Sequence, residues 1–385
     1  MKIRAIVYIV LAAAICLIVA YKAKAEINTD IIEYARDATV LIGGDQGGMG
    51  SGIILNEDGL VLTNYHVIHR SEELKVWFYD LHNNNFYTAE IIGIDPIADL
   101  ALIQMKVPDH LKPLKFLEME TETWDVGEEV FAIGHPMGIQ WTVSLGHLAN
   151  LERTGRITPY VNTIQHSAEI HQGNSGGPLL NRHGRVVGVN TYLLLPNKQW
   201  SGIAYAIHST IVKWSIDQML EIGITKYPAF KLDLRGLNPF GYEALKEIAP
   251  DNKIPKDLFG LLVFTLKEDG HAKSQGMWRF DIIVAIDGQP VNSLLDVREI
   301  LMPDYKPGQT VDLIYIREGH FRRTDYVLSE IEFDFLAYYD ESANERPEMP
   351  GPPKEEEKEK EEEQENEEVD PEDDEPSAFE EKNEN

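Results

Sequence analysis

The most informative stretch of this 385-residue chain is Gly173-Asn174-Ser175-Gly176-Gly177-Pro178. Glycines on both sides of Ser175 permit a sharp turn that presents the serine hydroxyl at the surface. A serine hydroxyl becomes a useful nucleophile only when a base removes its proton. The backbone N–H groups of Gly173 and Ser175 can both point at a developing oxyanion, and Asn174 shapes the amide geometry between them. The stretch therefore predicts a nucleophilic serine with an oxyanion hole built from residues 173–175.

Two upstream motifs offer the partners that such a serine needs. His66 lies in Thr63-Asn64-Tyr65-His66-Val67-Ile68, and Asp99 begins Asp99-Leu100-Ala101-Leu102. A histidine can take the hydroxyl proton, and a carboxylate can orient the imidazole. The chain order His, Asp, Ser is that of the chymotrypsin arrangement and differs from the orders of the α/β-hydrolases and subtilisin. Each motif alone is often a structural turn, whereas the three together predict a catalytic triad of His66, Asp99 and Ser175.

Between residues 27 and 207 the chain alternates short apolar runs with glycine turns. The runs are rich in Val, Ile and Thr, as in Val40-Leu41-Ile42, Leu60-Val61-Leu62-Thr63 and Val186-Val187-Gly188-Val189. Strands this short and regular are typical of barrels or sandwiches. Apolar residues at helical spacing then follow from Ile211 to Leu220 and stop at Gly223. This spacing predicts a helix that closes the first unit.

These motifs together resemble those of the HtrA/Deg family of trypsin-like serine proteases. Gly50-Ser51-Gly52-Ile53-Ile54 extends the histidine motif, and Gly134-His135-Pro136-Met137-Gly138 adds a further matching block. The resemblance implies a mainly β fold, a chymotrypsin/trypsin-like double β-barrel with six strands in each barrel, at about residues 35–120 and 125–210, and the triad in the cleft between them. It also implies an exported serine endopeptidase that degrades unfolded or damaged polypeptides, and a homotrimer or higher homo-oligomer formed through the residues after Glu26.

A second compact unit resembles an α+β PDZ domain. The supporting features are the run Phe280–Val291, a short helix near residues 296–301 and the turn Pro307-Gly308-Gln309. Such domains add a peptide as an extra strand and hold its carboxylate on backbone N–H groups. In the family the carboxylate loop is an aromatic-apolar-Gly-apolar segment. The matching residues here are Ala229-Phe230-Lys231-Leu232, which lack the glycine and in which the charge of Lys231 could compensate. The resemblance implies that the domain binds a peptide ligand, for recognition or regulation.

The expected domain order follows from these units. Residues 26–223 form the protease domain, residues 224–257 the linker and the start of the PDZ domain, and residues 258–332 the PDZ core. From residue 333 the chain becomes rich in Pro and Glu and then almost continuously charged. Such a segment cannot bury enough apolar surface to offset its ordering entropy. Residues 333–385 are therefore expected to be a disordered acidic tail.

The substrate pocket is expected, by family position, to have an apolar lining. Its walls would be Ile170, Thr191-Tyr192-Leu193 and Gly202-Ile203-Ala204, which suit a small or medium apolar side chain. Glu169 leaves a second interpretation open, because it lies six residues before Ser175, where trypsin-type enzymes that cleave after Lys or Arg carry an acidic residue. An outward, solvated Glu169 is the favoured interpretation, and a preference for basic residues is the alternative.

The N-terminus predicts export from the cytoplasm. Lys2 and Arg4 precede an apolar run over residues 5–21, and Ala23-Lys24-Ala25 fits a signal-peptidase site. Residues 1–25 are thus expected to be a cleaved signal peptide or, because the run has about 17 residues, an uncleaved inner-membrane anchor. Both interpretations place the rest of the chain outside the cytoplasm, in the periplasm or an equivalent compartment. No other contact with a membrane is expected.

Composition argues against several other classes of protein. The chain has 35 basic and 64 acidic residues, and its formal net charge of −29 would repel a polyphosphate, so no nucleic-acid partner is expected. The single cysteine, Cys16, lies in the N-terminal run, which excludes a disulfide framework and a cysteine nucleophile in the body of the protein. The pairs His66/His69 and His166/His171 lack the carboxylate partners of a metal site. Neither a metal nor a cofactor is expected.

Two alternative functions remain open at the level of the sequence. A regulatory protease that cuts one membrane-linked partner would suit the single PDZ unit and a membrane anchor. A holdase or scaffold with a PDZ domain and vestigial proteolysis would keep the fold without using Ser175. The intact triad argues against this last function, because a scaffold has no need of three catalytic residues.

Overall fold

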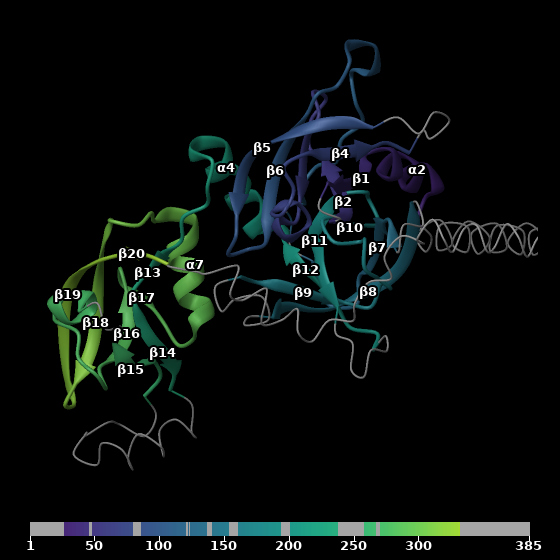
Figure 1. Cartoon of the computed structure of the whole chain (residues 1–385). Coiled ribbons are helices and arrows are strands. Elements are labelled where there is room, and N and C mark those ends of the chain that lie inside the picture. The colour runs from purple at the N-terminus through teal and green to yellow at the C-terminus, as the bar shows by residue number, and fades with distance from the viewer. Residues whose placement is uncertain are drawn as a thin grey trace, which may run out of the picture. The chain divides into compact units, whose positions relative to one another are not determined.

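The computed structural model describes residues 27–45, 48–79, 86–120, 122, 124–136, 141–153, 161–193, 201–237, 258–266 and 270–331. Strands dominate these residues, which confirms the mainly β class (Figure 1). The predicted signal peptide or anchor at residues 1–25 and the predicted tail at residues 333–385 lie outside the described part of the chain. Among the helices that are described, none is both long and apolar enough to cross a bilayer.

The first barrel closes six antiparallel strands in the order β1-β2-β3-β6-β5-β4. Branched apolar side chains fill it, because Val and Ile pack well on a pleated surface; Val40, Ile54, Val61 and Ile103 are fully buried. The strands are β1 (Thr39–Gly44), β2 (Met49–Ile54), β3 (Leu60–Thr63), β4 (Leu74–Trp77), β5 (Tyr87–Asp95) and β6 (Leu100–Met105).

The second barrel has the corresponding closed arrangement, in the order β10-β11-β12-β9-β8-β7. Its interior is again aliphatic, with Ile164, Leu179, Val187 and Ala206 fully buried. The strands are β7 (Glu129–Gly134), β8 (Thr142–Arg153), β9 (Thr163–His166), β10 (Pro178–Asn181), β11 (Val186–Leu193) and β12 (Ala204–His208). The two six-stranded barrels expected from the sequence are thus confirmed.

Short helices flank and connect the barrels. They are α2 (Thr29–Asp37) before β1, α3 (Tyr65–Ile68) after β3, η1 (Asp109–Leu111) and α4 (Ser209–Ile222) after β12. Helix α4 matches the helix predicted from apolar spacing. It ends at Gly223, whose φ of +79° is a left-handed conformation that glycine adopts without strain, and the N–H of Gly223 donates to the carbonyl of Met219.

The second unit is a sheet in the order β14-β15-β16-β18-β19, with β17 paired to β16. Helix α7 begins with a capping box in which the Ser293 hydroxyl accepts from the N–H of Asp296 and the Asp296 carboxylate accepts from the N–H of Ser293. The strands are β14 (Leu232–Gly236), β15 (Leu261–Leu266), β16 (Ile282–Ile286), β17 (Gln289–Pro290), β18 (Thr310–Arg317) and β19 (His320–Val327). The helices are α6 (His271–Ser274) and α7 (Leu294–Asp304), and a two-stranded pair joins β13 (Pro228–Ala229) to β20 (Ser329–Glu330).

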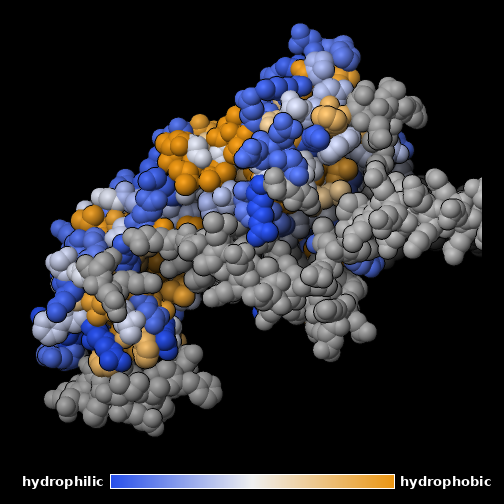
Figure 2. Space-filling model, in the orientation of Figure 1, coloured by the Kyte–Doolittle hydropathy of each residue, from blue (hydrophilic) through white to orange (hydrophobic). Residues whose placement is uncertain are grey.

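Apolar side chains gather on an outer face formed by β5 and α4. Ile91 and Ile92 of β5 are 46% and 40% exposed, and Leu220 and Ile222 of α4 are 54% and 51% exposed. Figure 2 shows an apolar patch where Figure 1 places α4. Much of the remaining visible surface is polar, as expected of a chain with this charge.

Candidate active site

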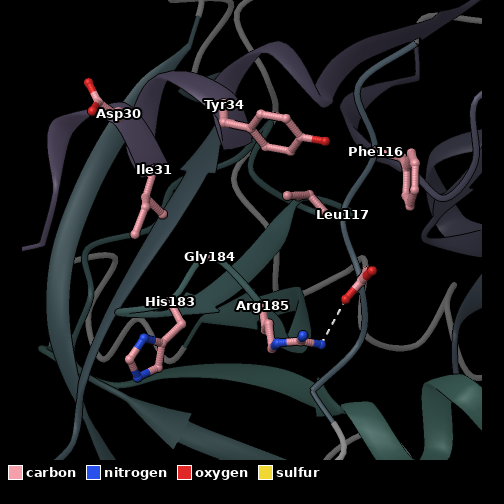
Figure 3. A pocket seen from close by; sticks show the side chains of 9 residues that line it. Asp30, Ile31, Tyr34, Phe116, Leu117, His183, Gly184 and Arg185 are labelled. Atoms are coloured by element: carbon pink, nitrogen blue, oxygen red, sulfur yellow. Dashed lines mark ion pairs between the residues drawn. The ribbon is translucent and has the colours of Figure 1, made fainter. Parts of the chain in front are cut away.

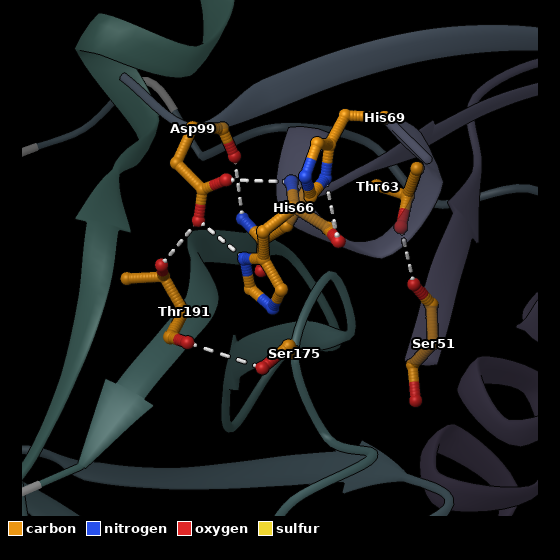
Figure 4. A network of polar contacts seen from close by, with 8 residues as sticks. Ser51, Thr63, His66, His69, Asp99, Ser175 and Thr191 are labelled. Carbon is orange, nitrogen blue, oxygen red and sulfur yellow. Dashed lines mark hydrogen bonds and ion pairs between the residues drawn. The ribbon is translucent and has the colours of Figure 1, made fainter. Parts of the chain in front are cut away.

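Three short connections bring His66, Asp99 and Ser175 together. His66 lies in α3 directly after β3, Asp99 in the turn between β5 and β6, and Ser175 in the loop between β9 and β10. The first barrel thus supplies the imidazole and the carboxylate, and the second supplies the hydroxyl (Figure 4). Asp99 has a φ of +55°, a left-handed conformation that Asp tolerates better than most residues.

The carboxylate of Asp99 holds His66 through two contacts. Its Oδ2 lies 2.7 Å from Nδ1 of the imidazole, and its Oδ1 accepts the backbone N–H of His66 at 2.9 Å. The hydroxyl of Thr191 donates to the same Oδ2 at 2.9 Å. Because an ionised carboxylate can only accept, the shared proton sits on Nδ1 of His66. The opposite ring nitrogen, Nε2, is then left as the one that can take a proton.

Ser175 lies on the side of the imidazole away from Asp99. Figure 4 shows the second ring nitrogen of His66 turned toward the Ser175 side chain. In this structure the Ser175 hydroxyl donates to the backbone carbonyl of Thr191 at 3.1 Å. Thr191 therefore contacts both ends of the triad, with its side chain on Asp99 and its carbonyl on Ser175. The serine proton must leave that carbonyl for His66 before the serine can react.

Backbone hydrogen bonds fix the loop that carries Ser175. The N–H of Asn174 donates to the carbonyl of His171 at 3.0 Å, and the N–H of Gly177 donates to the carbonyl of Asn174 at 3.0 Å. Gly173 has a φ of +102°, which L side chains rarely adopt and glycine adopts readily. The N–H groups of Gly173 and Ser175, predicted as oxyanion-hole donors, thus flank an asparagine that is held in a tight turn.

The predicted pocket walls come from β11, β12 and the segment before the Ser175 loop. Ile170 and Ala204 are buried, Ile203 is half-buried and Gly202 is exposed. Tyr192-Leu193 continues β11 and pairs with β12, and only its backbone is described. Of the predicted wall residues whose side chains are described, Ile170 and Ala204 are apolar and buried and Thr191 is polar and buried.

Glu169 turns to the surface. Its side chain is 57% exposed, and its Oε1 lies 3.0 Å from Nε2 of His171. Its backbone carbonyl accepts the hydroxyl of Ser144 at 2.5 Å, which anchors the main chain at this point. The carboxylate is thus paired with a neighbouring imidazole on the exterior of the loop.

Two contributors to this site were missed as such by sequence reasoning. Thr191 was expected as a pocket wall, and its hydroxyl contacts Asp99. Ser51 belongs to the quoted motif Gly50-Ser51-Gly52, and its hydroxyl donates to the carbonyl of Gly173 at 2.7 Å. The glycines on either side of Ser51 were the only local signal for it, and Thr191 had none, because both contacts join residues far apart in the sequence.

The predicted carboxylate loop of the second unit has an unusual backbone. Lys231, at the position where the family pattern has glycine, has a φ of +51°. Ala229 and Phe230 are buried, and the carbonyl of Phe230 accepts the hydroxyl of Tyr326. Leu232 begins β14, which is an edge strand of its sheet. A conformation that favours glycine is therefore formed here by a lysine.

One cavity of about 330 Å³ lies away from the triad (Figure 3). It is lined by Ile31 and Tyr34 of α2, by Leu117, and by His183 and Arg185 of the turn between β10 and β11. Across the described ranges, no cluster of three or more His, Cys, Asp or Glu side chains is placed to hold a metal ion.

The fold and this site define a two-barrel peptidase of the trypsin type that is followed by a PDZ domain. Residues 50–189 match the trypsin-like peptidase domain family, and residues 236–326 match the PDZ domain family. The chain belongs to the HtrA/Deg family of trypsin-like serine proteases with one PDZ domain.

Named relatives agree with this assignment. The chain is 34% identical over 284 residues to a probable periplasmic serine endoprotease DegP-like of Chlamydia muridarum, an alignment that covers 73% of this chain and 54% of the relative. It is 35% identical over 266 residues to the periplasmic serine endoprotease DegP of Escherichia coli K12, covering 66% of this chain and 53% of DegP. The chain thus spans about half the length of the curated relatives that it matches.

A solved structure shares the fold over nearly its whole length. The HtrA-type protease AlgW, in complex with a tripeptide, superposes with a TM-score of 0.70 at 23% sequence identity. The match covers 80% of this chain and 98% of the AlgW chain. At this identity the likeness establishes the fold, and the chemistry must be argued from the residues themselves.

Proposed function

We propose that the chain is a serine endopeptidase that hydrolyses unfolded or damaged polypeptides outside the cytoplasm. In this reaction Oγ of Ser175 attacks the peptide carbonyl carbon while Nε2 of His66 takes the hydroxyl proton. The N–H groups of Gly173 and Ser175 stabilise the oxyanion. His66 then gives its proton to the leaving amine, and a water activated by the same base hydrolyses the acyl-enzyme.

The observation that carries the proposal is the pairing of Asp99 with His66. The 2.7 Å contact to Nδ1 and the 2.9 Å contact to the backbone N–H fix both the tautomer and the position of the ring. Asp99 is only 3% exposed, so water does not compete for its oxygens. A histidine held in this way, with a serine on its other side, is the arrangement that general-base activation requires.

The experiment compares the full-length chain with its Ser175→Ala variant. Each is incubated with an unfolded protein, and the fragments are mapped by mass; the same samples are treated with a fluorophosphonate that labels activated serines. Cleavage and labelling by the wild type alone would support the proposal. An absence of both in the wild type would overturn it in favour of a binding protein. Cleavage of many sites indicates degradation, whereas a single cut indicates a regulatory protease.

We further propose that the pocket accepts a small or medium apolar side chain. Buried Ile170 and Ala204 support this, and so does the pairing of Glu169 with His171 on the exterior. A pocket for Lys or Arg would need a carboxylate that faces its interior. The mapped cut sites test the proposal, because a preference for basic residues would contradict it.

For the PDZ domain we propose binding of an extended peptide along β14. This strand pairs only with β15 among the described strands, so its other edge can accept a further strand. The left-handed backbone at Lys231 supports a loop that directs N–H groups toward a carboxylate. Titration with peptides that have a free or an amidated C-terminus tests the proposal, since equal affinity would contradict carboxylate capture.

We also propose that the chain is exported and forms a homotrimer through its N-terminal region. The word periplasmic in the names of its relatives supports the location. The exposed ring of Tyr34 on α2 supports an interface near the N-terminus. The mass of the purified full-length chain in solution tests the assembly, and a monomeric mass would contradict it. The fate of residues 5–21, cleaved or retained as an anchor, is read from the N-terminal sequence of the mature protein.

A further inference from the structure

We propose that Ser51 is a positioning residue for this peptidase reaction: its hydroxyl, held by His135, fixes the oxyanion-hole loop of the opposite barrel. The inference rests on the proposed function, because it concerns the same reaction. Ser51 lies in β2 of the first barrel and is fully buried. The loop that it contacts belongs to the second barrel.

Ser51 contacts the loop on both sides of Asn174. Its backbone N–H donates to the carbonyl of Ser175 at 2.8 Å, and its hydroxyl donates to the carbonyl of Gly173 at 2.7 Å. Its own carbonyl accepts the hydroxyl of Thr63 at 2.7 Å, which ties Ser51 to β3. One residue of the first barrel thus holds the two carbonyls that bracket the predicted oxyanion donor.

The direction of these bonds assigns a role to His135. A serine hydroxyl has one proton, and Ser51 gives it to the carbonyl of Gly173, which can only accept. The 2.9 Å contact between the Ser51 hydroxyl and Nδ1 of His135 must then be a bond donated by the imidazole. Burial lowers the pKa of His135 to about 3, so the ring is neutral and carries its one proton on Nδ1. The bonds run from His135 to Ser51 to Gly173.

These bonds orient the N–H group of Ser175. A carbonyl and the N–H of the next residue share one rigid plane. The peptide plane between Gly173 and Asn174 is held at both ends. The Gly173 carbonyl accepts from Ser51, and the Asn174 N–H donates to a neighbouring carbonyl. The plane after Ser175 is held in the same way at both ends, through Ser51 and through the N–H of Gly176. The Ser175 N–H lies between these two fixed planes, so its neighbours set its direction.

The backbones of β2 and the Ser175 loop also lie close together around Ser51. A Cβ atom at Gly176 would lie 2.2 Å from the carbonyl oxygen of Ser51, and one at Gly177 would lie 3.0 Å from Cβ of Ser51. A Cβ atom at Gly50 would lie 2.9 Å from the carbonyl oxygen of Ser175. Glycine at these three positions is therefore what lets β2 and the Ser175 loop approach each other this closely.

The test compares Ser51→Ala with Ser209→Ala in the full-length chain. Ser209 is a matched control because it is also a buried serine, 1% exposed, whose hydroxyl donates to a backbone carbonyl, that of Glu120, at 3.0 Å. Ser51→Ala should lower kcat on a peptide substrate by about 10- to 100-fold, with KM changed by less than about twofold. It should also slow fluorophosphonate labelling of Ser175. Ser209→Ala should leave both rates near those of the wild type.

A second pair of variants tests the role of His135. The side-chain amide of Asn can donate from nearly the same place as Nδ1 of His, whereas Leu has no donor. His135→Leu should reproduce part of the loss in kcat seen in Ser51→Ala, and His135→Asn should restore most of it. Thermal unfolding of all four variants shows that each is folded at the assay temperature.

The outcomes separate this inference from the proposed function. If the wild type and Ser209→Ala neither cleave nor react with the fluorophosphonate, the proposed function fails. If both are active and Ser51→Ala matches them in kcat and labelling rate, the positioning role of Ser51 fails. Equal losses of activity in Ser51→Ala and Ser209→Ala would also overturn it, because both losses would then follow from stability.

Discussion

Each of the two barrels has six antiparallel strands in a corresponding order. The titratable groups that they bury differ, because one buries an acid and the other buries bases. The first barrel buries a carboxyl group, Asp95, at the end of β5, and the second buries the imidazoles of His135 and His166. Burial penalises the charged form of any group, so it raises the pKa of an acid and lowers that of a base. The buried titratable groups of the two barrels therefore have pKa shifts of opposite sign.

Asp95 is the polar centre of the first barrel's contact with α4. Its Oδ2 accepts the hydroxyls of Ser215 at 2.7 Å and Tyr227 at 2.8 Å, and its Oδ1 accepts the N–H of Ala98 at 2.9 Å. Burial raises the pKa of Asp95 despite these bonds. The same turn carries Asp99 four residues later. Asp95 therefore stabilises the fold at one end of the turn, and Asp99 contacts His66 at the other.

The largest expected effect is a loss of kcat on substitution of Asp99. Asp99→Asn should lower kcat by about 10⁴-fold, because an amide does not hold His66 in the tautomer with the proton on Nδ1. The melting temperature should change little, since Asn keeps the shape of the side chain. Steady-state kinetics on a peptide substrate measure the loss. A variant that keeps a tenth of the wild-type kcat would contradict the role of Asp99.

The other end of the turn should affect stability instead. Asp95→Ala leaves the hydroxyls of Ser215 and Tyr227 and the N–H of Ala98 without their acceptor, which should cost about 3 kcal/mol in the free energy of unfolding. The kcat of the folded enzyme should change by much less than in Asp99→Asn. Urea unfolding and kinetics on the same sample measure the two effects.

The cost of Asp95→Ala should also depend on pH. The pKa of Asp95 is raised in the folded state, so its stabilising contribution is fully present below the pKa of the unfolded chain. It is lost as the pH rises through the raised folded pKa. The difference in unfolding free energy between wild type and variant should therefore be larger at pH 4 than at pH 8. A difference that grows with pH would mean that the pKa is lowered.

The contribution of His166, in the second barrel, to the free energy of unfolding should change with pH in the opposite direction. Burial lowers the pKa of His166 to about 3, so at pH 5 the ring takes a proton in the unfolded chain and not in the folded one. Its contribution is present above the unfolded value and is lost as the pH falls. Between pH 7 and pH 5 the wild type should lose on the order of 2 kcal/mol that His166→Leu does not lose. Urea unfolding at the two pH values measures these losses. If the wild type and His166→Leu lose the same free energy of unfolding between pH 7 and pH 5, the prediction is contradicted.

The smallest effect is expected outside both barrels. Deletion of residues 340–385 removes much of the acidic excess but no residue of the triad or of either barrel. The kcat on a short peptide should stay within about twofold of the full-length value, and the pH dependence of unfolding should be unchanged. A large loss of activity would show that the segment docks substrate or regulates the protease.

Local sequence was enough to predict the parts of the molecule that depend on neighbours in the chain. The glycines around Ser175 predict a turn. Gly223 ends α4 at the point where apolar residues at helical spacing stop. The short-range pattern of strands and turns predicted barrels or a sandwich, and the resemblance to the HtrA/Deg family implied the double barrel. Such features are fixed within a few residues, so a single sequence contains them.

Contacts between distant residues could not be read in the same way. Asp95, in Asp95-Pro96, looks like an exposed turn residue, and its burial depends on Ser215 and Tyr227, which lie 120 and 132 residues away. The hydroxyl of Thr191 reaches Asp99 across 92 positions. For the left-handed backbone at Lys231 the only signal was the glycine of the family pattern at that position, because lysine itself does not favour this conformation.

The division of the site between the barrels makes the site depend on the integrity of the fold. Ser51 and His66 come from one barrel and Ser175 from the other, so a copy in which the barrels separate loses its active site in the same event. A copy whose barrels have separated therefore cannot carry out the cleavage proposed above.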